Sequence, residues 1–227
     1  MRIYPSTPIN MKLIIKLNLF MALLTVTSVA FAQADINTEV FTSHVTFNAS
    51  GANVAYIGKG HSFTVDVIGT DVKEAPHGDV SQPNQNFVIV DKDIVQASLV
   101  PLPQPIADGV MLSKLTDEQI KPTLEGYVDY EIDYVKQLNA SPTNIKKEWK
   151  TINSRLFLLW YFEFKPEGGS DVAVKMSAQV YLSTLCFNQV LDLNMPLADK
   201  KDYDKFEAQL EKIAATLKTY DKVLDVR

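Results

Sequence analysis

The sequence has a single cysteine, Cys186, among its 227 residues. With no second cysteine, the chain cannot close an internal disulfide bond, so an apolar core must hold its fold together. Cys186 stands in an apolar stretch far from the N-terminus, which excludes a lipid anchor attached where a leader peptide is cleaved. In such a stretch we expect the thiol to act as a small buried hydrophobic group rather than as a reactive one.

Motifs that would hold a metal, a phosphate or a catalytic nucleophile are also missing. The three histidines, His44, His61 and His77, form neither an H-E-x-x-H motif nor an i, i+4 pair, and the chain has no C-x-x-C. These absences argue against a zinc site. The chain has no G-x-S-x-G nucleophile elbow and no glycine-rich phosphate loop either. We therefore expect no metal and no cofactor.

Clusters of basic residues are absent as well, since no stretch gathers five or more Lys and Arg. The whole chain carries a net charge of −5. Removal of residues 1–32 would bring it to about −8, because that segment holds Arg2, Lys12 and Lys16 and no acid. An acidic surface repels a phosphate backbone, so we do not expect nucleic acid as a partner.

An apolar stretch near the N-terminus has the features of an export signal. From Met11 onward, Lys12 and Lys16 precede the apolar residues 17–29, and Ala30-Phe31-Ala32 follows. A basic start, an apolar core of about 7–15 residues and an A-x-A site are typical of a cleaved secretory signal peptide. The alternative, a permanent transmembrane anchor, needs about 20 apolar residues, and Asn18 argues against it.

We therefore expect a signal peptide at 1–32, of which 1–10 lie upstream of a true start at Met11. A flexible lead at 33–42 and a single domain at 43–227 would follow, because about 195 residues suit one domain of good size. The product would be an exported bacterial protein, soluble in the periplasm or outside the cell. It would carry neither a lipid nor a stable membrane anchor.

Alternating apolar and polar residues predict strands in the first half of this domain. The segments 45–51, 61–69, 86–90 and 94–100 show this alternation. The turn-forming residues 91–93 separate the last two segments. The stretch 70–86 is polar and punctuated by Pro and Gly, which predicts a loop.

Two helices are predicted by apolar residues at helical spacing. The first opens at Thr116, where T-D-E-Q matches a capping box, and Pro122 either kinks it or marks its true start. Its apolar stripe consists of Ile120, Leu124, Tyr127, Val128, Tyr134, Val135 and Leu138. The second covers 202–222 and has a narrow apolar seam formed by Tyr203, Phe206, Leu210, Ile213, Leu217 and Tyr220.

The stretch LFLLWYFEF at 156–164 lies between the two helices. As a strand it has one wholly apolar face and a second face that is apolar in its first half. This predicts a central strand covered on both sides, and nine residues are too few for a membrane-spanning helix. A turn at 166–171 and alternation at 172–182 complete a hairpin, and 187–193 is expected to add a third strand.

Strands with one helix inserted and one appended indicate an α+β fold, in which helices flank an antiparallel β-sheet on both faces. This order, with LEGYVDYEIDYVKQ after a Pro-rich loop and FEAQLEKIAATLKTYDK after CFNQVLDLNMP, resembles the PsbP-like superfamily over roughly 40–227. That superfamily includes the photosystem II protein PsbP, a Ran-binding nuclear import factor and exported bacterial proteins. The resemblance implies an α-β-α sandwich and a role in binding or assembly, and it carries over no catalytic residue.

Glu131 is the one residue that breaks the apolar stripe of the first helix. A carboxylate there must be paired, hydrogen-bonded or neutral. Its candidate partners are Arg155 and the hydroxyl groups of Tyr127, Tyr134 and Tyr161. Two interpretations stay open: a buried contact that fixes the position of the helix, or a general acid or ligand-holding group with a raised pKa.

Two functions are compatible with these features. The favoured one is an exported, non-catalytic binding or assembly module of the bacterial envelope, whose partner is another envelope protein or a small ligand. Its candidate contact residues are Glu131, Arg155, Tyr127 and Tyr134. The alternative is a small periplasmic hydrolase or isomerase that uses Glu131 or His61 as its acid and base.

Overall fold

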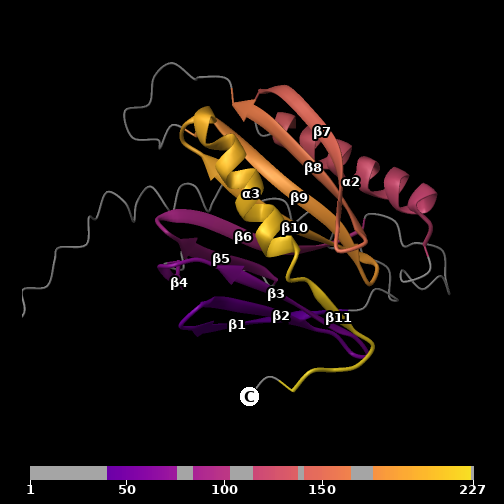
Figure 1. Cartoon of the computed structure of the whole chain (residues 1–227). Coiled ribbons are helices and arrows are strands. Elements are labelled where there is room, and N and C mark those ends of the chain that lie inside the picture. Colours follow the sequence, from indigo (N-terminus) through magenta and orange to yellow (C-terminus); the bar gives the residue numbers. More distant parts are fainter. Residues whose placement is uncertain (1–39, 76–83, 103–114, 138–140, 165–175, 226–227) are drawn as a thin grey trace, which may run out of the picture.

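The computed structural model describes residues 40–75, 84–102, 115–137, 141–164 and 176–225. In these ranges, strands account for 53% of the structure and form two antiparallel sheets. Two α-helices of the described chain, α2 (Asp117–Gln137) and α3 (Tyr203–Ala214), pack against the sheets (Figure 1). None of the helices in the described ranges has the length and apolar character needed to cross a membrane. The predicted signal peptide at 1–32 lies outside the described residues.

The larger sheet contains seven strands in the order β4-β5-β6-β10-β9-β8-β7. They are β4 (Val72–Glu74), β5 (Gln85–Val90), β6 (Asp93–Pro101), β7 (Pro142–Ile152), β8 (Arg155–Phe164), β9 (Ala178–Cys186) and β10 (Gln189–Leu197). β8 lies between β7 and β9, and its residues from Phe157 to Tyr161 are buried irrespective of the side to which they point. The prediction of a strand covered on both faces is therefore confirmed.

The smaller sheet contains four strands in the order β1-β2-β3-β11. They are β1 (Thr42–Asn48), β2 (Gly51–Ile57), β3 (Ser62–Ile68) and β11 (Lys218–Tyr220). In β3 the predicted alternation is confirmed, since Phe63, Val65 and Val67 are buried and Ile68 is exposed. Phe41, at the end of the expected flexible lead, is buried together with apolar side chains of β2 and β3.

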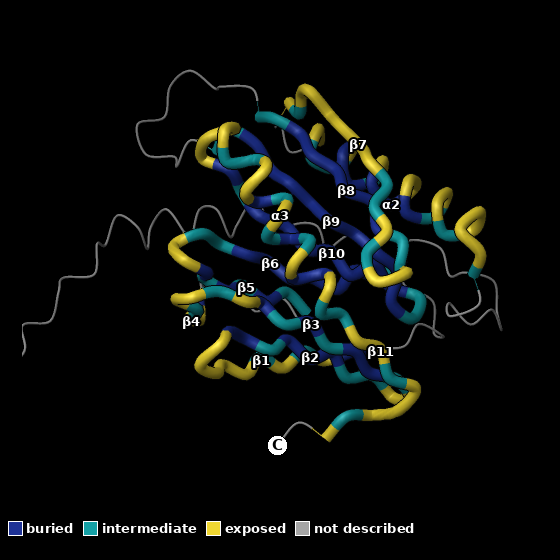
Figure 2. The backbone as a smooth tube through the Cα atoms, in the orientation of Figure 1, coloured by how far each residue is buried: buried dark blue, intermediate teal, exposed yellow. Residues whose placement is uncertain are grey.

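Two apolar cores lie on opposite faces of the larger sheet. Figure 1 shows α2 on one face and α3 on the other, and Figure 2 shows that buried residues concentrate in the strands between them. We call the core that joins one face to the smaller sheet and α3 the first core, and the core that joins the other face to α2 the second core. Because successive side chains of a strand point to opposite faces, β8 contributes to both. Phe157, Leu159 and Tyr161 belong to the first core, and the even-numbered residues from Leu158 to Phe162 belong to the second.

The predicted α-β-α sandwich is wrong. The protein is mainly β, and one face of the larger sheet packs on a second sheet rather than on a layer of helices alone. The physical reason is that β2 and β3 have their own buried face, which packs on β5 and β6. Tyr56 of β2 illustrates this packing, because its hydroxyl group donates a hydrogen bond of 2.8 Å to the carbonyl oxygen of Ala97 on β6.

Four strands of the structure, β2, β4, β7 and β11, are not predicted from the sequence. β2 lies between the expected segments 45–51 and 61–69. β4 lies inside the expected loop 70–86, where it pairs with β5. β7 consists mostly of polar and charged residues, so it has no apolar alternation, and charged residues suit its place at the edge of the sheet. β11 replaces the last part of the helix expected at 202–222. Thr216 accounts for the change of direction, because its hydroxyl oxygen accepts a hydrogen bond of 2.7 Å from the backbone N–H of Asp66 on β3.

Helix α2 begins as the capping box predicts. The backbone N–H of Thr116 donates a hydrogen bond of 3.1 Å to Oε1 of Gln119. Pro122 lies inside the helix. The helix then covers the sheet with Leu124, Tyr127, Val128, Glu131 and Ile132, all of which are buried. Leu138 of the predicted stripe lies outside the described residues.

Candidate functional site

Glu131 reaches the second core from the middle of α2, on the side of the helix that faces the sheet. Only 6% of the residue is exposed, although Leu124, Val128 and Ile132 around it are apolar. The side chain is buried because helical spacing places position 131 on the same face as positions 124, 127 and 128. The sequence-based prediction of a buried glutamate within the apolar stripe is thus confirmed.

A row of buried polar side chains crosses the sheet on the face that α2 covers. Strand alternation places them there, since residues 96 and 98 of β6, 179 and 183 of β9, and 192 and 194 of β10 share this face. We call this set the polar row; it consists of Gln96, Ser98, Gln179, Ser183, Asp192 and Asn194, each at most 4% exposed. So much buried polar surface is unusual for a sheet face, and it needs internal hydrogen bonds to be stable.

One part of the polar row is a chain of amide hydrogen bonds. The side-chain N–H of Gln179 donates to Asn194 at 3.0 Å, and Asn194 donates to Gln96 at 3.2 Å. Gln96 in turn donates to the hydroxyl group of Ser98 at 2.7 Å. The chain runs from β9 across β10 to β6, so it ties the three strands together through their side chains.

The other part of the polar row is a pair of hydrogen bonds that ends at the carboxyl group of Asp192. The indole N–H of Trp160 on β8 donates a hydrogen bond of 2.8 Å to the hydroxyl oxygen of Ser183, and Ser183 donates its own proton to Asp192. Ser183 lies directly opposite Asp192 in the pairing of β9 with β10. Asp192 therefore accepts a hydrogen bond inside a core from which water is excluded.

Burial makes both carboxyl groups of this interface weak acids. Removal from water and, as a smaller cause, the charge of Asp192 together raise the pKa of Glu131 from 4.5 to about 8. Removal from water also raises the pKa of Asp192 from 3.8 to about 7, against the opposing effect of its hydrogen bonds with Ser183 and Asn194. Neither group forms an ion pair with any residue in the described part of the chain.

Glu131 and Tyr134 both have a buried oxygen without a hydrogen-bond partner. These atoms are Oε1 of Glu131 and the hydroxyl oxygen of Tyr134, one turn further along α2. The charge of Glu131 contributes to a raised pKa of Tyr134, after the larger effect of burial. Tyr127 is buried in the second core, and burial, followed by the charges of Asp192 and Glu131, raises its pKa. Two of the predicted tyrosines are thus near Glu131, although no hydrogen bond joins either to it.

The structure does not bring Arg155 to Glu131. Arg155 is an odd-numbered residue of β8, and such residues face away from α2. Its guanidinium group donates to the carbonyl oxygen of Leu185 at 3.1 Å and to the hydroxyl group of Thr219 at 3.4 Å. The predicted pair is therefore wrong, because the two side chains lie on opposite faces of the sheet.

Two other predicted residues are also distant from Glu131. Tyr161 belongs to the first core, where its ring meets that of Tyr203 edge-on at 5.0 Å. The ring of His61 stacks on Phe187, which packs against the first core, with 4.6 Å between ring centroids. His61 and Glu131 therefore do not form a catalytic pair.

The sequence analysis did not identify Asp192, which like Glu131 is a buried carboxyl group with a raised pKa. A signal for it exists in the predicted strand FNQVLDL, residues 187–193, where Val190 and Asp192 alternate with Leu191 and Leu193. The alternation suggests an ordinary strand with one solvent-exposed face, but in the tertiary structure that face is buried. A buried acid on the sheet cannot be distinguished from an exposed one by alternation alone.

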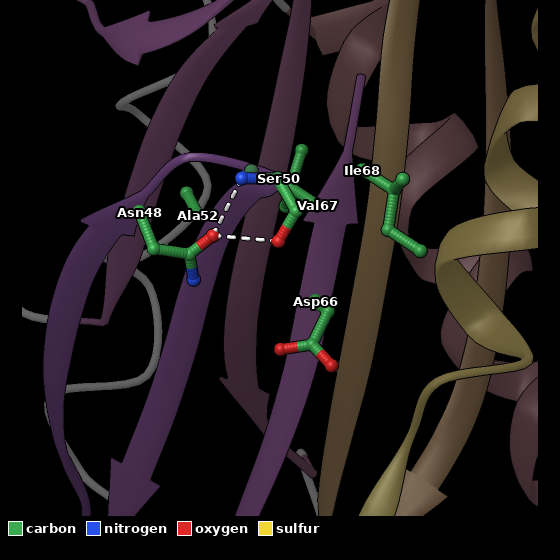
Figure 3. A pocket seen from close by; sticks show the side chains of 7 residues that line it. Asn48, Ser50, Ala52, Asp66, Val67 and Ile68 are labelled. Atoms are coloured by element: carbon green, nitrogen blue, oxygen red, sulfur yellow. Dashed lines mark hydrogen bonds between the residues drawn. The ribbon is translucent and has the colours of Figure 1, made fainter. Parts of the chain in front are cut away.

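Two surface hollows lie outside the polar row. One, of about 210 Å³, lies beside the turn between β1 and β2 and is lined by Asn48, Ser50 and Asp66 among others (Figure 3). Its side chains largely serve the turn itself, since Asn48 accepts hydrogen bonds from the backbone N–H and the hydroxyl group of Ser50. Asp66 accepts one of 2.6 Å from Asn53.

The second hollow, which we call the β7–α3 cleft, has a volume of about 380 Å³. It is lined by Lys146, Lys147, Glu148, Leu159, Trp160 and Tyr203. The ammonium group of Lys146 lies 5.7 Å from the ring centroid of Tyr161 and 6.0 Å from that of Tyr203. Lys150 beside it is bound to Glu148 and Glu207, whereas Lys146 has no ion pair within the described residues.

The buried carboxyl groups and the β7–α3 cleft differ in the chemistry that they can support. Glu131 and Asp192 can each hold or release a proton near neutral pH, but both are buried. No three His, Cys, Asp or Glu of the described ranges come together as ligands for a metal ion. The β7–α3 cleft offers an ammonium group, two aromatic rings and an opening to solvent.

Comparison with known proteins finds a weak likeness in fold. The solution structure of cyanobacterial PsbP (CyanoP) from Synechocystis sp. PCC 6803 matches with a TM-score of 0.43 and 11% sequence identity, over 77% of this chain and 95% of that chain. No family model matches the sequence, and no curated protein matches it either.

Proposed function

We propose that this chain is an exported, non-catalytic binding or assembly module of the bacterial cell envelope. The observation that carries the proposal is the burial of the groups best suited to acid–base chemistry. Glu131 is 6% exposed, Asp192 is 4% exposed and Ser183 is fully buried, so a substrate does not reach them. An acid or base in catalysis must come within hydrogen-bond reach of the proton that it transfers.

The enzymatic alternative loses support for the same reason. Its strongest point is that Glu131 has a pKa of about 8, as a general acid at neutral pH requires. It also needs a second titratable group in a cavity open to substrate. His61 stacks on Phe187 by the first core, and Asp192 is as deeply buried as Glu131.

The β7–α3 cleft is the surface to which we assign the partner. Its volume of about 380 Å³ lies within the range of roughly 300–1,000 Å³ that is common for ligand sites. Tyr203 and Lys146 at its wall combine an aromatic ring with an ammonium group that no carboxylate of the described chain neutralises. Such residues are suited to recognition rather than to holding the core together.

Export is tested by expressing the full chain in a bacterial host and measuring the mass of the product in each cell fraction. We expect a periplasmic or secreted product that begins at Gln33, after removal of residues 1–32. A product that keeps these residues and stays in the cytoplasm would contradict the assignment to the envelope.

Binding is tested by gentle co-purification from envelope fractions of the native host, with the exposed Lys146→Glu variant alongside the wild type. We expect a stoichiometric partner that is retained by the wild type and lost by this variant. Lys59→Glu, which changes an exposed lysine in the turn between β2 and β3, serves as the control and should retain the partner. No partner, or the same partner with all three proteins, would count against the cleft.

A further inference from the structure

The two sheets of the described chain have four edges, and three of these are protected against pairing with another strand. β4, at one edge of the larger sheet, has only three residues. β7, at its other edge, carries Lys146, Lys147 and Lys150, and its pairing with β8 shifts between Thr143 and Lys146. Short strands, lysines and bulges all hinder an edge from pairing with another chain.

The third protected edge is the β3 side of the smaller sheet, which α3 and the segment after it cover. β11 pairs with residues 62–64 of β3. Farther along β3, the hydroxyl oxygen of Thr216 accepts a hydrogen bond of 2.7 Å from the backbone N–H of Asp66. Gln209 of α3 donates one of 2.7 Å to the carbonyl oxygen of Ile68. Side chains therefore occupy backbone groups of β3 that β11 does not reach.

The fourth edge, formed by β1, has none of these protections. Its sequence, TSHVTFN, contains no Lys, Arg, Asp or Glu and no proline. Its register with β2 is unbroken from Thr42 to Asn48, so no bulge interrupts it. None of its seven residues is buried, and Figures 1 and 2 show the strand at the border of the molecule, on the side away from α2. β1 is therefore an open edge of the kind that pairs with another strand.

Every second residue of β1 directs its backbone N–H and C=O away from β2. A two-residue turn joins the two strands and closes on the pair Asn48–Gly51. Such a closing pair is hydrogen-bonded, so the alternation of an antiparallel ladder turns the backbone groups of Ser43, Val45 and Phe47 outward. Within the described part of the chain, no hydrogen bond reaches these outward groups. They are available to a further strand.

The side chains of β1 are complementary to a second copy of the same strand. Phe47 is 37% exposed, although it lies beside the buried Ala52 and Val67 on the face that packs on the larger sheet. Antiparallel pairing about a two-fold axis at Thr46 places Phe47 of each copy opposite Val45 of the other. An aromatic residue opposite a β-branched one stabilises an antiparallel pair. The same register covers the exposed ring of Phe47.

We propose that two copies of this chain associate through β1, which pairs with itself antiparallel about a two-fold axis at Thr46 and joins the two smaller sheets into one. On the outer face of this sheet, Thr46 then lies opposite Thr46, and His44 lies opposite Asn48. Because β1 contains no Lys, Arg, Asp or Glu, the pairing places no like charges opposite each other. β1 and the β7–α3 cleft share no residue, so the association does not depend on a partner in the cleft.

Sedimentation velocity of the purified chain at neutral pH tests the association. An edge contact between two such strands is smaller than the roughly 1,200 Å² of a stable interface, so we expect a dimer with a Kd on the order of 10–100 µM. A chain that remains monomeric up to about 1 mM would overturn the proposal.

Charged variants of the exposed Thr46 test the register. Thr46→Lys and Thr46→Glu each place like charges together at the two-fold axis, so each should raise the Kd at least about tenfold. An equimolar mixture of the two variants should restore the association, because opposite charges then meet. Thr151→Lys makes the same change at an exposed position of β7 and should keep the Kd of the wild type. An unchanged Kd for Thr46→Lys, or a mixture that associates no more tightly than each variant alone, would overturn the pairing of β1.

Hydrogen exchange of the wild type, measured by mass spectrometry, needs no substitution, so it holds even if the variants fold poorly. Samples are compared at about tenfold below and about tenfold above the Kd. Amides of residues 42–48 should exchange severalfold more slowly in the concentrated sample, because Ser43, Val45 and Phe47 gain hydrogen-bond partners. Amides of β7 and α2 should not change. Protection that appears at β7 or α2 and not at β1 would overturn the proposal.

Discussion

Replacement of Ser183 by Ala tests the hydrogen-bonded part of the polar row that ends on Asp192. The hydroxyl group of Ser183 accepts a hydrogen bond of 2.8 Å from the indole of Trp160 and donates one to Asp192, and the residue is fully buried. The substitution removes both bonds and opens no route for water. Trp160 then has a buried donor without an acceptor, and Asp192 loses a donor.

The expected loss in the free energy of unfolding depends on pH. A buried polar group left without its partner costs about 1–3 kcal/mol, and more when the group is charged. At pH 8, where Asp192 with its pKa of about 7 is mostly ionised, both losses apply and we expect about 2–5 kcal/mol. At pH 5 Asp192 is neutral and the loss at Trp160 predominates, so we expect about 1–3 kcal/mol.

Urea unfolding followed by circular dichroism at pH 5 and pH 8 measures both values. Circular dichroism is preferable to fluorescence because the substitution changes the surroundings of Trp160. Ser50→Ala is the control, since Ser50 is exposed and bonds only within its own turn, and it should change stability by no more than about 0.5 kcal/mol. A loss at Ser183 below about 1 kcal/mol at pH 8, or the same loss at both pH values, would refute the assignment of this hydrogen-bond chain.

Three further predictions concern the interior. The folded protein holds a proton on Glu131 that the unfolded chain releases between pH 4.5 and about 8, so the free energy of unfolding of the wild type should fall across this interval by several kcal/mol. Urea titrations of Glu131→Gln should show a clearly smaller fall, and equal falls would contradict the raised pKa of Glu131. Leu124→Ala should lower the free energy of unfolding by about 2–5 kcal/mol in the same assay, because the side chain is fully buried beneath α2, and a loss within the error of the measurement would show that α2 does not pack there. The thiol of Cys186 should resist a thiol-specific disulfide reagent at pH 8 and react fully in denaturant, since burial raises its pKa to about 11; rapid reaction of the folded protein would contradict this burial.

The sequence alone determines most of the local structure. Alternation identifies β3, β5, β6 and β8, and the capping box at Thr116 marks the start of α2. The same reasoning identifies Glu131 as a carboxyl group in an apolar stripe, because helical spacing is a property of the local chain. These features are recognisable since each depends on residues only a few positions apart.

Tertiary structure alone decides how these elements combine. β2 and β3 form a second sheet instead of extending the first, and β7 joins an edge although its residues lack apolar alternation. The expected end of the last helix becomes β11, because Thr216 bonds to a strand 150 positions earlier in the sequence. Each of these outcomes depends on contacts between segments that are distant in the sequence, and the periodicity within one segment does not predict such contacts.

The same limit applies to the partner of Glu131. Sequence reasoning suggests Arg155 because an acid in an apolar stripe calls for a base, and Arg155 begins the strand that packs beneath the helix. The structure instead buries a second carboxyl group, that of Asp192, on the same face of the sheet, where it accepts a hydrogen bond from Ser183. Alternation shows which residues of a strand share a face, but only the packed fold decides which of the two faces α2 covers. That choice places Arg155 on the far side of the sheet from Glu131.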